Sequence, residues 1–267
     1  MMKLCPCYPY HVPSARHEPL RRVCVPHPPR LCVPSFRDLG NTFATSGVIS
    51  FDGGVMNLRT LRDVAAGDEL THSYLDLTAT TSERQRELGA RYGFVCHCVR
   101  CSDGHSVDEC MEAGPSTEEA RKVVRDAQEA IELARSRADA GGTDSGNKRL
   151  HEAIAAIRGE CGELSVLRFK GERAARAAAA ALGDNMLELQ SAHAMSSFLE
   201  HSLGHLPAHP TLSMHRQELS TLEAEYNDIS TAMVLMQKCV WALGVSHGPK
   251  HRIYREAVAW LEELREA

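Results

Sequence analysis

The amino-acid sequence predicts an α+β protein, with a small β-rich unit followed by a mostly α-helical domain. Two β-type segments, GVISF and VMNLR, flank Asp52-Gly53-Gly54, which can supply the positive φ angles of a tight hairpin turn. From residue 116 the apolar residues recur at helical spacing behind Ser116-Thr-Glu-Glu119, a capping-box pattern. The first 46 residues differ from both parts, because eight of the twelve prolines fall between Pro6 and Pro34.

Residues 1–46 are therefore predicted to form a proline-rich, irregular N-terminal arm. Each proline removes a backbone donor and interrupts any helix or central strand. The arm is basic, with six Lys or Arg against two acids, in a chain of net charge -5. A solvated tail is the simplest interpretation of this charge. No basic stripe follows it, so we expect no specific nucleic-acid binding.

Composition indicates a soluble protein with its own hydrophobic core. The 267 residues are 43% hydrophobic, yet no apolar run approaches the roughly 20 residues that span a bilayer. The first residues lack the continuous apolar region of a signal peptide. We therefore expect no membrane partner and a cytoplasmic and/or nuclear location. In that setting the ten cysteines are expected to be metal ligands or buried thiols.

The β unit is predicted to span residues 47–103, together with the cysteine segment that ends it. A third strand is expected after Gly67-Asp68, with Leu70, His72 and Tyr74 on one face. The segment SERQRELGARYGF then predicts a helix that leads directly into the cysteines.

A polar linker is predicted at 104–115 and a helical domain at 116–267. The segment GGTDSGN at 141–147 should separate the first helix of this domain from those that follow. The last helix is expected from about His251, with one apolar side formed by Ile253, Ala257, Val258, Leu261 and Leu264. Before it, Gly248 and Pro249 stop the preceding helix, and His247 is interpreted as a turn or packing residue.

Cys96, Cys98 and Cys101 have the spacing Cys-x-Cys-x-x-Cys, which suits metal binding. A closed structural zinc site has four ligands, so these cysteines supply three of the four. His97, Cys32 or water remain open as the fourth ligand. His97 lies between two ligands, which restricts its ability to turn inward.

Four motifs carry a family resemblance, in matching order and spacing. They are Gly67-Asp68-Glu69-Leu70, Ser73-Tyr74-Leu75-Asp76, Arg84 to Leu88, and Tyr92-Gly93-Phe94 with the three cysteines. Together they resemble the C-terminal half of a SET domain and its post-SET loop, in the SET and MYND domain (SMYD-type) family of protein-lysine methyltransferases. Residues 200–267 look like the final helices of that family's tetratricopeptide-like domain.

The resemblance implies roles for three aromatic residues. Tyr74 looks like the catalytic tyrosine, beside which a neutral lysine amine takes a methyl group from S-adenosylmethionine. A phenol, whose pKa lies near 10, can position that amine without taking the methyl group itself. Tyr92 and Phe94 look like walls of the lysine channel and the cofactor pocket, where ring faces attract cations. Asp68 and Glu69 are interpreted as turn residues.

The zinc interpretation also changes with the resemblance. In the family the fourth ligand of the post-SET loop should be the cysteine of an Asn-His-Ser-Cys segment, and Phe43 occupies that place here. We therefore predict weak or absent zinc in the isolated chain, and one tightly held zinc per chain would contradict this.

Several parts of the family pattern have no match. No Gly-x-Gly turn for the cofactor occurs in the chain, and residues 40–46 contain no histidine. The cysteines and histidines of the arm do not reproduce the paired Cys-x-x-Cys pattern of a MYND finger; they are Cys5, Cys7, Cys24, Cys32, His11, His17 and His27.

These observations leave three hypotheses. The first is a SET-type, S-adenosylmethionine-dependent protein-lysine methyltransferase, acting on a lysine of a protein or peptide, in a chain that lacks the first half of its catalytic domain. The second is a catalytically inactive SET remnant whose helical domain binds a protein or peptide. The third is that residues 1–46 are not the natural beginning of the protein.

Overall fold

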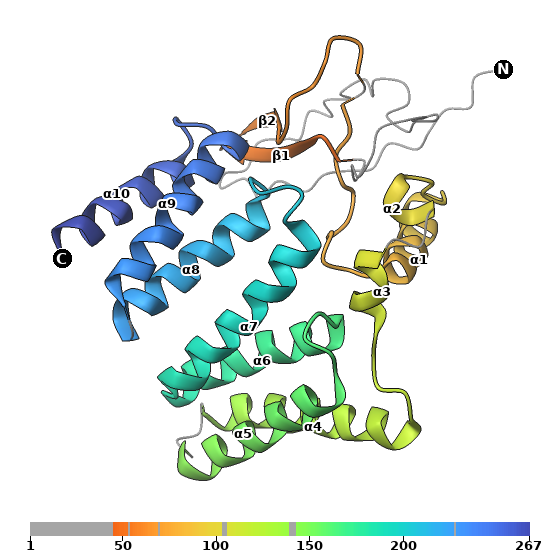
Figure 1. Cartoon of the computed structure of the whole chain (residues 1–267), viewed down its shortest axis with the longest axis vertical. Helices are drawn as coiled ribbons and strands as arrows, with labels where there is room; N and C mark the ends of the chain where they lie inside the picture. The colour runs from red at the N-terminus through yellow and green to blue at the C-terminus, as the bar shows by residue number, and fades with distance from the viewer. Residues whose placement is uncertain (1–44, 53, 69, 103–105, 139–142, 227) are drawn as a thin grey trace, which may run out of the picture. The chain divides into compact units, whose positions relative to one another are not determined.

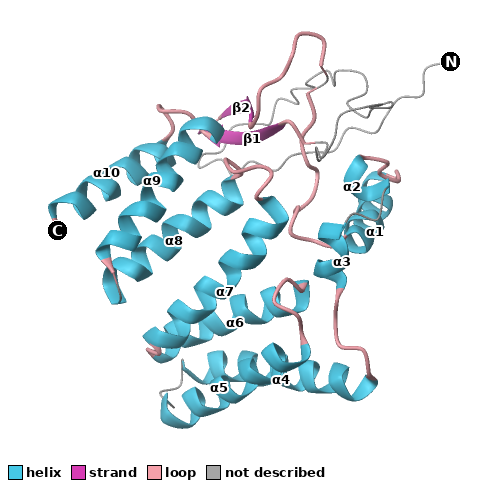
Figure 2. Ribbon diagram, viewed as in Figure 1, coloured by secondary structure: helices cyan, strands magenta, loops and turns pink. Residues whose placement is uncertain are grey.

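The computed structural model describes residues 45–52, 54–68, 70–102, 106–138, 143–226 and 228–267 (Figure 1). The predicted N-terminal arm therefore lies, apart from Thr45 and Ser46, outside the described residues. Two strands are followed by ten helices in the described part of the chain (Figure 2). The predicted α+β class with a mostly helical C-terminal part is confirmed.

The predicted hairpin is present. Strands β1 (Gly47–Asp52) and β2 (Val55–Thr60) pair antiparallel, from Gly47 opposite Thr60 to Asp52 opposite Val55. Of the expected turn glycines, Gly53 lies outside the described residues, and Gly54 does not have a left-handed φ. The positive φ expected at Gly54 is therefore wrong, and Asp52, expected in the turn, is the last residue of β1.

The predicted third strand is reduced to one contact. Gly47 forms a single parallel bridge with His72, and the backbone N–H groups of Ser46 and Gly47 both donate to the carbonyl of Thr71. The chain then leaves the sheet, because the Ser73 hydroxyl accepts from Leu75 N–H and donates to the Leu75 carbonyl. Such local side-chain bonds compete with strand pairing and favour a turn.

A helical segment follows and reaches the cysteines as expected. Helix α1 (Thr81–Tyr92) starts at a capping box between Thr80 and Glu83. It ends at Gly93, whose φ of 71° is left-handed, a conformation that glycine adopts without strain. Helix α2 (Val99–Ser102) contains Cys101, and α3 (Ser106–Glu112) occupies most of the predicted linker at 104–115.

The region from residue 116 is helical throughout its described part. Its helices are α4 (Glu118–Ala138), α5 (Thr143–Glu160), α6 (Val166–Leu182), α7 (Asn185–Leu203), α8 (Pro210–Tyr226), α9 (Ile229–Ser246) and α10 (Arg252–Glu266). The predicted capping box between Ser116 and Glu119 is wrong. The Thr117 side chain accepts from Ala120 N–H instead, and an alanine has no side-chain acceptor for the reciprocal bond. Helix α5 begins inside the predicted break at 141–147, whereas α10 begins directly after His251 as expected.

Each helix from α4 to α10 packs against its neighbour in the chain, and α4 also packs against α6 (Figure 1). One apolar core lies among α4, α5, α6 and the start of α7. A second joins α6, α7, α8 and α9 with Leu61, Leu77 and Met111, which come from the segments before residue 116. A third lies between α9 and α10 and includes Ala257, Leu261 and Leu264 of the predicted apolar side.

The hairpin contacts the α9–α10 turn through two hydrogen bonds. Arg59 Nε donates to the Val245 carbonyl at 2.7 Å, and His251 Nε2 lies 3.2 Å from the Phe51 carbonyl oxygen. Gly248, with a φ of 86°, lies so close that an added Cβ would come within 2.9 Å of the Arg59 guanidinium. A glycine is required there. His247 follows α9 in this turn, in accord with its interpretation as a turn residue.

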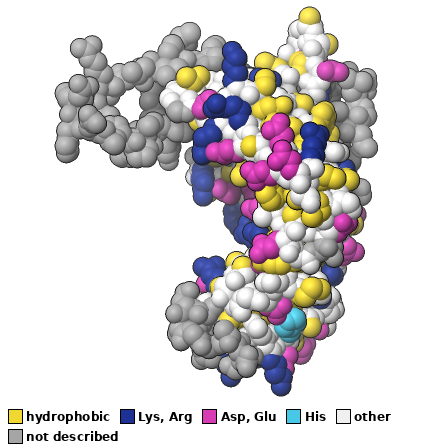
Figure 3. Space-filling model, turned by 90° about the vertical axis from the view of Figure 1, so that its left-hand side faces the viewer, with side chains coloured by type: hydrophobic (Ala, Val, Ile, Leu, Met, Phe, Trp, Pro, Cys, Tyr) yellow, Lys and Arg dark blue, Asp and Glu magenta, His cyan; other side chains and the backbone are white. Residues whose placement is uncertain are grey.

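Helix α9 qualifies the prediction that no apolar run could cross a membrane. By length and composition alone, Ile229–Ser246 is apolar enough to do so. Core helices of soluble proteins meet the same criterion. In α9, 33% of the helix is buried, including Ala232, Met236 and Leu243 in the core shared with α10. The surface in Figure 3 mixes acidic, basic and hydrophobic side chains.

Candidate functional site

The three aromatic residues singled out by the sequence lie together. The ring centroids of Tyr74 and Tyr92 are 5.1 Å apart, and Phe94 lies 6.0 Å from Tyr74 and 6.5 Å from Tyr92. His72 adds a fourth ring 5.0 Å from Tyr74. The rings are tilted or edge-on to one another, an arrangement that aromatic pairs prefer.

Local structure explains how these rings meet. Tyr92 is the last residue of α1, and the left-handed Gly93 turns the chain so that Phe94 returns towards Tyr74. Tyr74 belongs to the turn that replaces the predicted third strand. The cluster is open to solvent, since Tyr74 is 41% and Tyr92 47% exposed. Both tyrosines therefore present part of their surface to solvent.

The three predicted metal ligands also lie together. The sulfur atoms of Cys96, Cys98 and Cys101 lie within 4.8 Å of one another. The backbone N–H groups of Cys101 and Ser102 both donate to the Cys98 carbonyl at 2.9 Å, which wraps α2 around the cluster. Three sulfur atoms this close fit three corners of a tetrahedral zinc site, whose Zn–S distances are about 2.3 Å.

The environment of these thiols is shared among them. Hydrogen bonding of Cys98 to Cys101 and then to Cys96 raises the pKa of the Cys98 thiol well above its usual range. Hydrogen bonding to Cys96 likewise raises the pKa of Cys101, while Arg84 opposes the increase. His97 is exposed and is not part of the cluster, and Cys32 and Phe43 lie outside the described residues. The fourth ligand thus stays a prediction.

A buried ion cluster lies directly behind the cysteines. Asp108 of α3 is bonded by Arg84 Nη2 at 3.1 Å and by Arg100 Nη2 at 2.8 Å, and all three side chains are buried. Burial alone would raise the pKa of Asp108, but the hydrogen bonds from Arg100, Thr81 and Arg84 outweigh it and lower that pKa. Asp108 is therefore ionised at neutral pH and holds α1, α2 and α3 together.

Sequence reasoning missed this ion cluster. In the sequence Arg84 belongs to one of the family motifs, and Asp108 lies in the predicted polar linker. The available signal was weak: Met111, three residues after Asp108, is an apolar residue at helical spacing, and it is almost completely buried.

Of the two acids interpreted as turn residues, Asp68 accepts from Ala65 N–H at 3.0 Å, and Glu69 lies outside the described residues.

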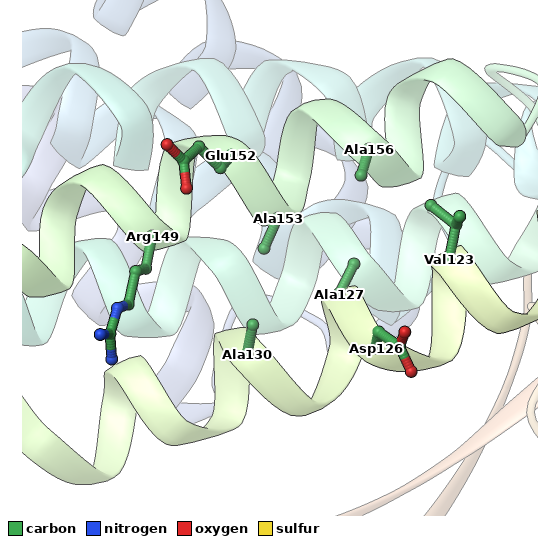
Figure 4. A pocket seen from close by; sticks show the side chains of 8 residues that line it. All are labelled: Val123, Asp126, Ala127, Ala130, Arg149, Glu152, Ala153 and Ala156. Carbon is green, nitrogen blue, oxygen red and sulfur yellow. The ribbon is translucent and has the colours of Figure 1, made fainter.

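A shallow groove lies between α4 and α5, far along the chain from both clusters (Figure 4). Its volume is about 320 Å³. Small apolar side chains line its floor and charged side chains its rim; the residues are Val123, Asp126, Ala127, Ala130, Arg149, Glu152, Ala153 and Ala156.

Comparison with known proteins gives consistent matches, although no family model matches the chain. Histone-lysine N-methyltransferase SMYD3 of Mus musculus is 24% identical over 237 residues, covering 86% of this chain and 52% of the relative. Histone-lysine N-methyltransferase Smyd1 of the same species is 25% identical, covering 76% of this chain and 42% of the relative. SET domain and MYND-type zinc finger protein 6 of Schizosaccharomyces pombe is 38% identical over 61 residues, 23% of this chain and 13% of the relative.

The chain spans about half the length of the SMYD3 relatives it matches, 52% in each case. These relatives support the class of methyltransferase-like SET proteins. Within that class the chain is similar to the SET and MYND domain (SMYD-type) family, as its motifs predicted.

Proposed function

We propose that this chain carries the aromatic residues of the lysine channel and the zinc-binding cysteine segment of a SET-type, S-adenosylmethionine-dependent protein-lysine N-methyltransferase. The observation that carries the proposal is the grouping of Tyr74, Tyr92 and Phe94, which come from two separate segments, with both tyrosines partly exposed. The cysteine cluster follows them directly in the chain, in the order that the family motifs require.

The aromatic cluster suits the recognition of a cationic group. Ring faces within about 6 Å of an ammonium or sulfonium group attract it through their quadrupoles. When bound, S-adenosylmethionine supplies the methyl group. Tyr92 and Phe94 contribute ring faces to the cofactor pocket and the lysine channel. The Tyr74 hydroxyl accepts or donates a hydrogen bond at the substrate amine and orients it in its neutral form.

In this proposal the cysteines have a structural role. Cys96, Cys98 and Cys101 hold a zinc ion that fixes the loop after Phe94, and the metal takes no part in the reaction. Three protein thiolates bind zinc less tightly than a closed set of four, so the affinity should be modest. The substrate is a lysine side chain on a protein or peptide, and the protein acts in the cytoplasm and/or nucleus.

Methyl transfer to a lysine-containing substrate protein, with and without Tyr74→Phe, tests the proposal. Loss of the hydroxyl should lower the rate about 10²- to 10⁴-fold, the range for a positioned proton-handling group. Tyr254→Phe is a matched control, because Tyr254 packs in the core between α9 and α10. Unchanged methylation by Tyr74→Phe would remove Tyr74 from the mechanism.

A second candidate function is protein binding by the helical region without catalysis. The groove between α4 and α5 favours it, since an apolar floor with a charged rim suits a peptide or protein segment. Calorimetric titration with S-adenosylmethionine separates the two candidates. Saturable binding at micromolar concentration would count against the purely binding function.

A further inference from the structure

Two adjacent residues of α1 contact opposite ends of the cysteine loop. Gln85 Nε2 donates to the Cys96 carbonyl at 2.6 Å, while Gln85 Oε1 accepts from Cys96 N–H at 2.9 Å. Arg84 Nη2 donates to Cys101 Sγ at 3.8 Å. The side-chain amide of Gln85 thus holds the backbone of Cys96, and the guanidinium of Arg84 contacts the sulfur atom of Cys101.

Arg84 is itself held rigidly. Its Nη1 donates to the Ala79 carbonyl, and its Nη2 donates to Thr81 Oγ1 at 2.8 Å and to Asp108. The planar fork of a guanidinium is suited to several such bonds in fixed directions. The Arg84 side chain is only 4% exposed, so its orientation towards Cys101 is set by the surrounding structure.

Arg84 brings a positive charge to the cysteine cluster, because its Nη2 contacts the Cys101 sulfur. A zinc ion with three thiolates would carry one negative charge in excess. Opposite charges would therefore meet at this contact. Buried charges are stabilised by such pairing, because desolvation is costly without it.

We propose that Arg84 and Gln85 are positioning residues of the cysteine metal site. Gln85 holds the backbone of Cys96 in its ligating position, and Arg84 orients the Cys101 sulfur and balances the charge of the three-thiolate complex. Partners behind metal ligands commonly change affinity by about 10- to 100-fold when they are removed. The role rests on the zinc site of the proposed function and extends it to residues that do not touch the metal.

The test measures zinc affinity of the full chain by competition with a chromogenic chelator. Arg84→Met removes the hydrogen bonds and the charge, and should weaken zinc binding about 10- to 100-fold. Arg84→Lys keeps the charge but not the fork, and should recover part of the loss. Arg86→Met is the matched control on the same helix, and its exposed side chain should leave the affinity unchanged.

Gln85→Ala provides a second, milder variant in case Arg84→Met does not fold. It should weaken binding about 10-fold, at the lower end of the same range. Cobalt in place of zinc gives an independent readout, since the sulfur-to-cobalt absorption bands should shift in Arg84→Met and not in Arg86→Met. Far-ultraviolet circular dichroism and a thermal melt of each variant exclude a general loss of structure.

The outcomes separate this role from the zinc site itself. If the unmodified chain binds zinc and both Arg84→Met and Gln85→Ala bind it equally well, the positioning role is wrong and the zinc site stands. If the unmodified chain binds no zinc at micromolar concentration, the zinc site is wrong, and the positioning role falls with it.

Discussion

The hairpin-and-loop region, residues 45–112, and the helical region, residues 116–267, are stabilised in different ways. In the helical region large apolar side chains such as Phe198 and Leu187 are fully buried. In the hairpin, Phe51, Val55 and Met56 are mostly exposed. What the hairpin-and-loop region buries is largely polar, above all the ion cluster behind the cysteines. The helical region therefore depends on apolar packing, and the other region on hydrogen bonds, paired charges and its contacts with the helices.

The largest expected effect contrasts one phenylalanine from each region. Phe198 is completely buried, and its ring centroid lies 4.2 Å from that of Phe169, so Phe198→Ala should lower the free energy of unfolding by about 3–5 kcal/mol. Phe51 is 60% exposed, and Phe51→Ala should change the free energy of unfolding by less than about 0.5 kcal/mol. Denaturant unfolding followed by circular dichroism measures both.

Similar losses of unfolding free energy for the two alanine variants would show that Phe51 is buried in solution and that the two regions are stabilised alike. A reduced loss in Phe198→Ala alone would mean that α7 repacks around the cavity.

The second prediction concerns pH and a buried histidine of the helical region. Burial first, and then the positive charge of Arg176, lower the pKa of His215 from 6.5 to about 4. His215 therefore stays neutral in the folded state while the unfolded chain takes up a proton. Its contribution is fully present above pH 6.5 and is lost as pH falls towards 4. At about 1.4 kcal/mol per pKa unit, the loss is about 3 kcal/mol.

Between pH 6.5 and pH 4 the unfolding free energy of His215→Leu should fall by about 3 kcal/mol less than that of the unmodified protein. Denaturant titrations across this pH range measure the difference. His205, whose pKa burial lowers to about 3, still contributes in this variant. Identical pH dependence with and without His215 would show that this side chain is solvated in the folded protein.

The third prediction concerns the N-terminal cap of α1, a polar feature of the hairpin-and-loop region. The Thr80 hydroxyl caps α1 by accepting a hydrogen bond from Glu83 N–H at 3.2 Å. In return, the Glu83 carboxylate accepts a hydrogen bond from Thr80 N–H. Thr80→Ala should destabilise α1 by about 1 kcal/mol, while Thr80→Ser keeps the cap. Amide hydrogen exchange should show faster opening of α1 only in the alanine variant. Equal exchange rates in both variants would mean that the cap is not formed.

The fourth prediction concerns an ion pair between the two regions, for which we expect only a small effect. Lys170 of α6 bonds Glu83 of α1 at 2.8 Å, but both side chains are partly exposed. Lys170→Met should lower the unfolding free energy by less than about 1 kcal/mol, and high salt should remove the difference. A much larger loss would show that this pair is a principal contact between α1 and the helical region.

Local patterns predicted the elements that depend on local interactions. The hairpin, α1, α4 and α10 were found because periodicity, caps and turn residues lie within each segment. The prediction of a third strand was wrong because the Ser73 hydroxyl bonds Leu75 within the turn, so that only His72 pairs with Gly47. The contacts that would align this strand join residues about 25 positions apart, and such contacts leave no periodic signal in the sequence.

The same distinction holds for the site. Cysteine spacing predicted the cluster of sulfur atoms, and the family resemblance predicted the aromatic group. Asp108 escaped both, because it pairs with Arg84 across 24 positions and belongs to no motif. Gln85 likewise reaches Cys96 across 11 positions. Long-range polar contacts of this kind become visible only when the chain is folded.

Calorimetric titration of the full chain with S-adenosylmethionine is the decisive test of the proposed function. We expect saturable one-to-one binding that Tyr92→Ala weakens and that Tyr254→Phe, in the α9–α10 core, leaves unchanged. A flat titration of the unmodified chain, or binding that is indifferent to Tyr92, would contradict the methyltransferase assignment and favour the helical binding module.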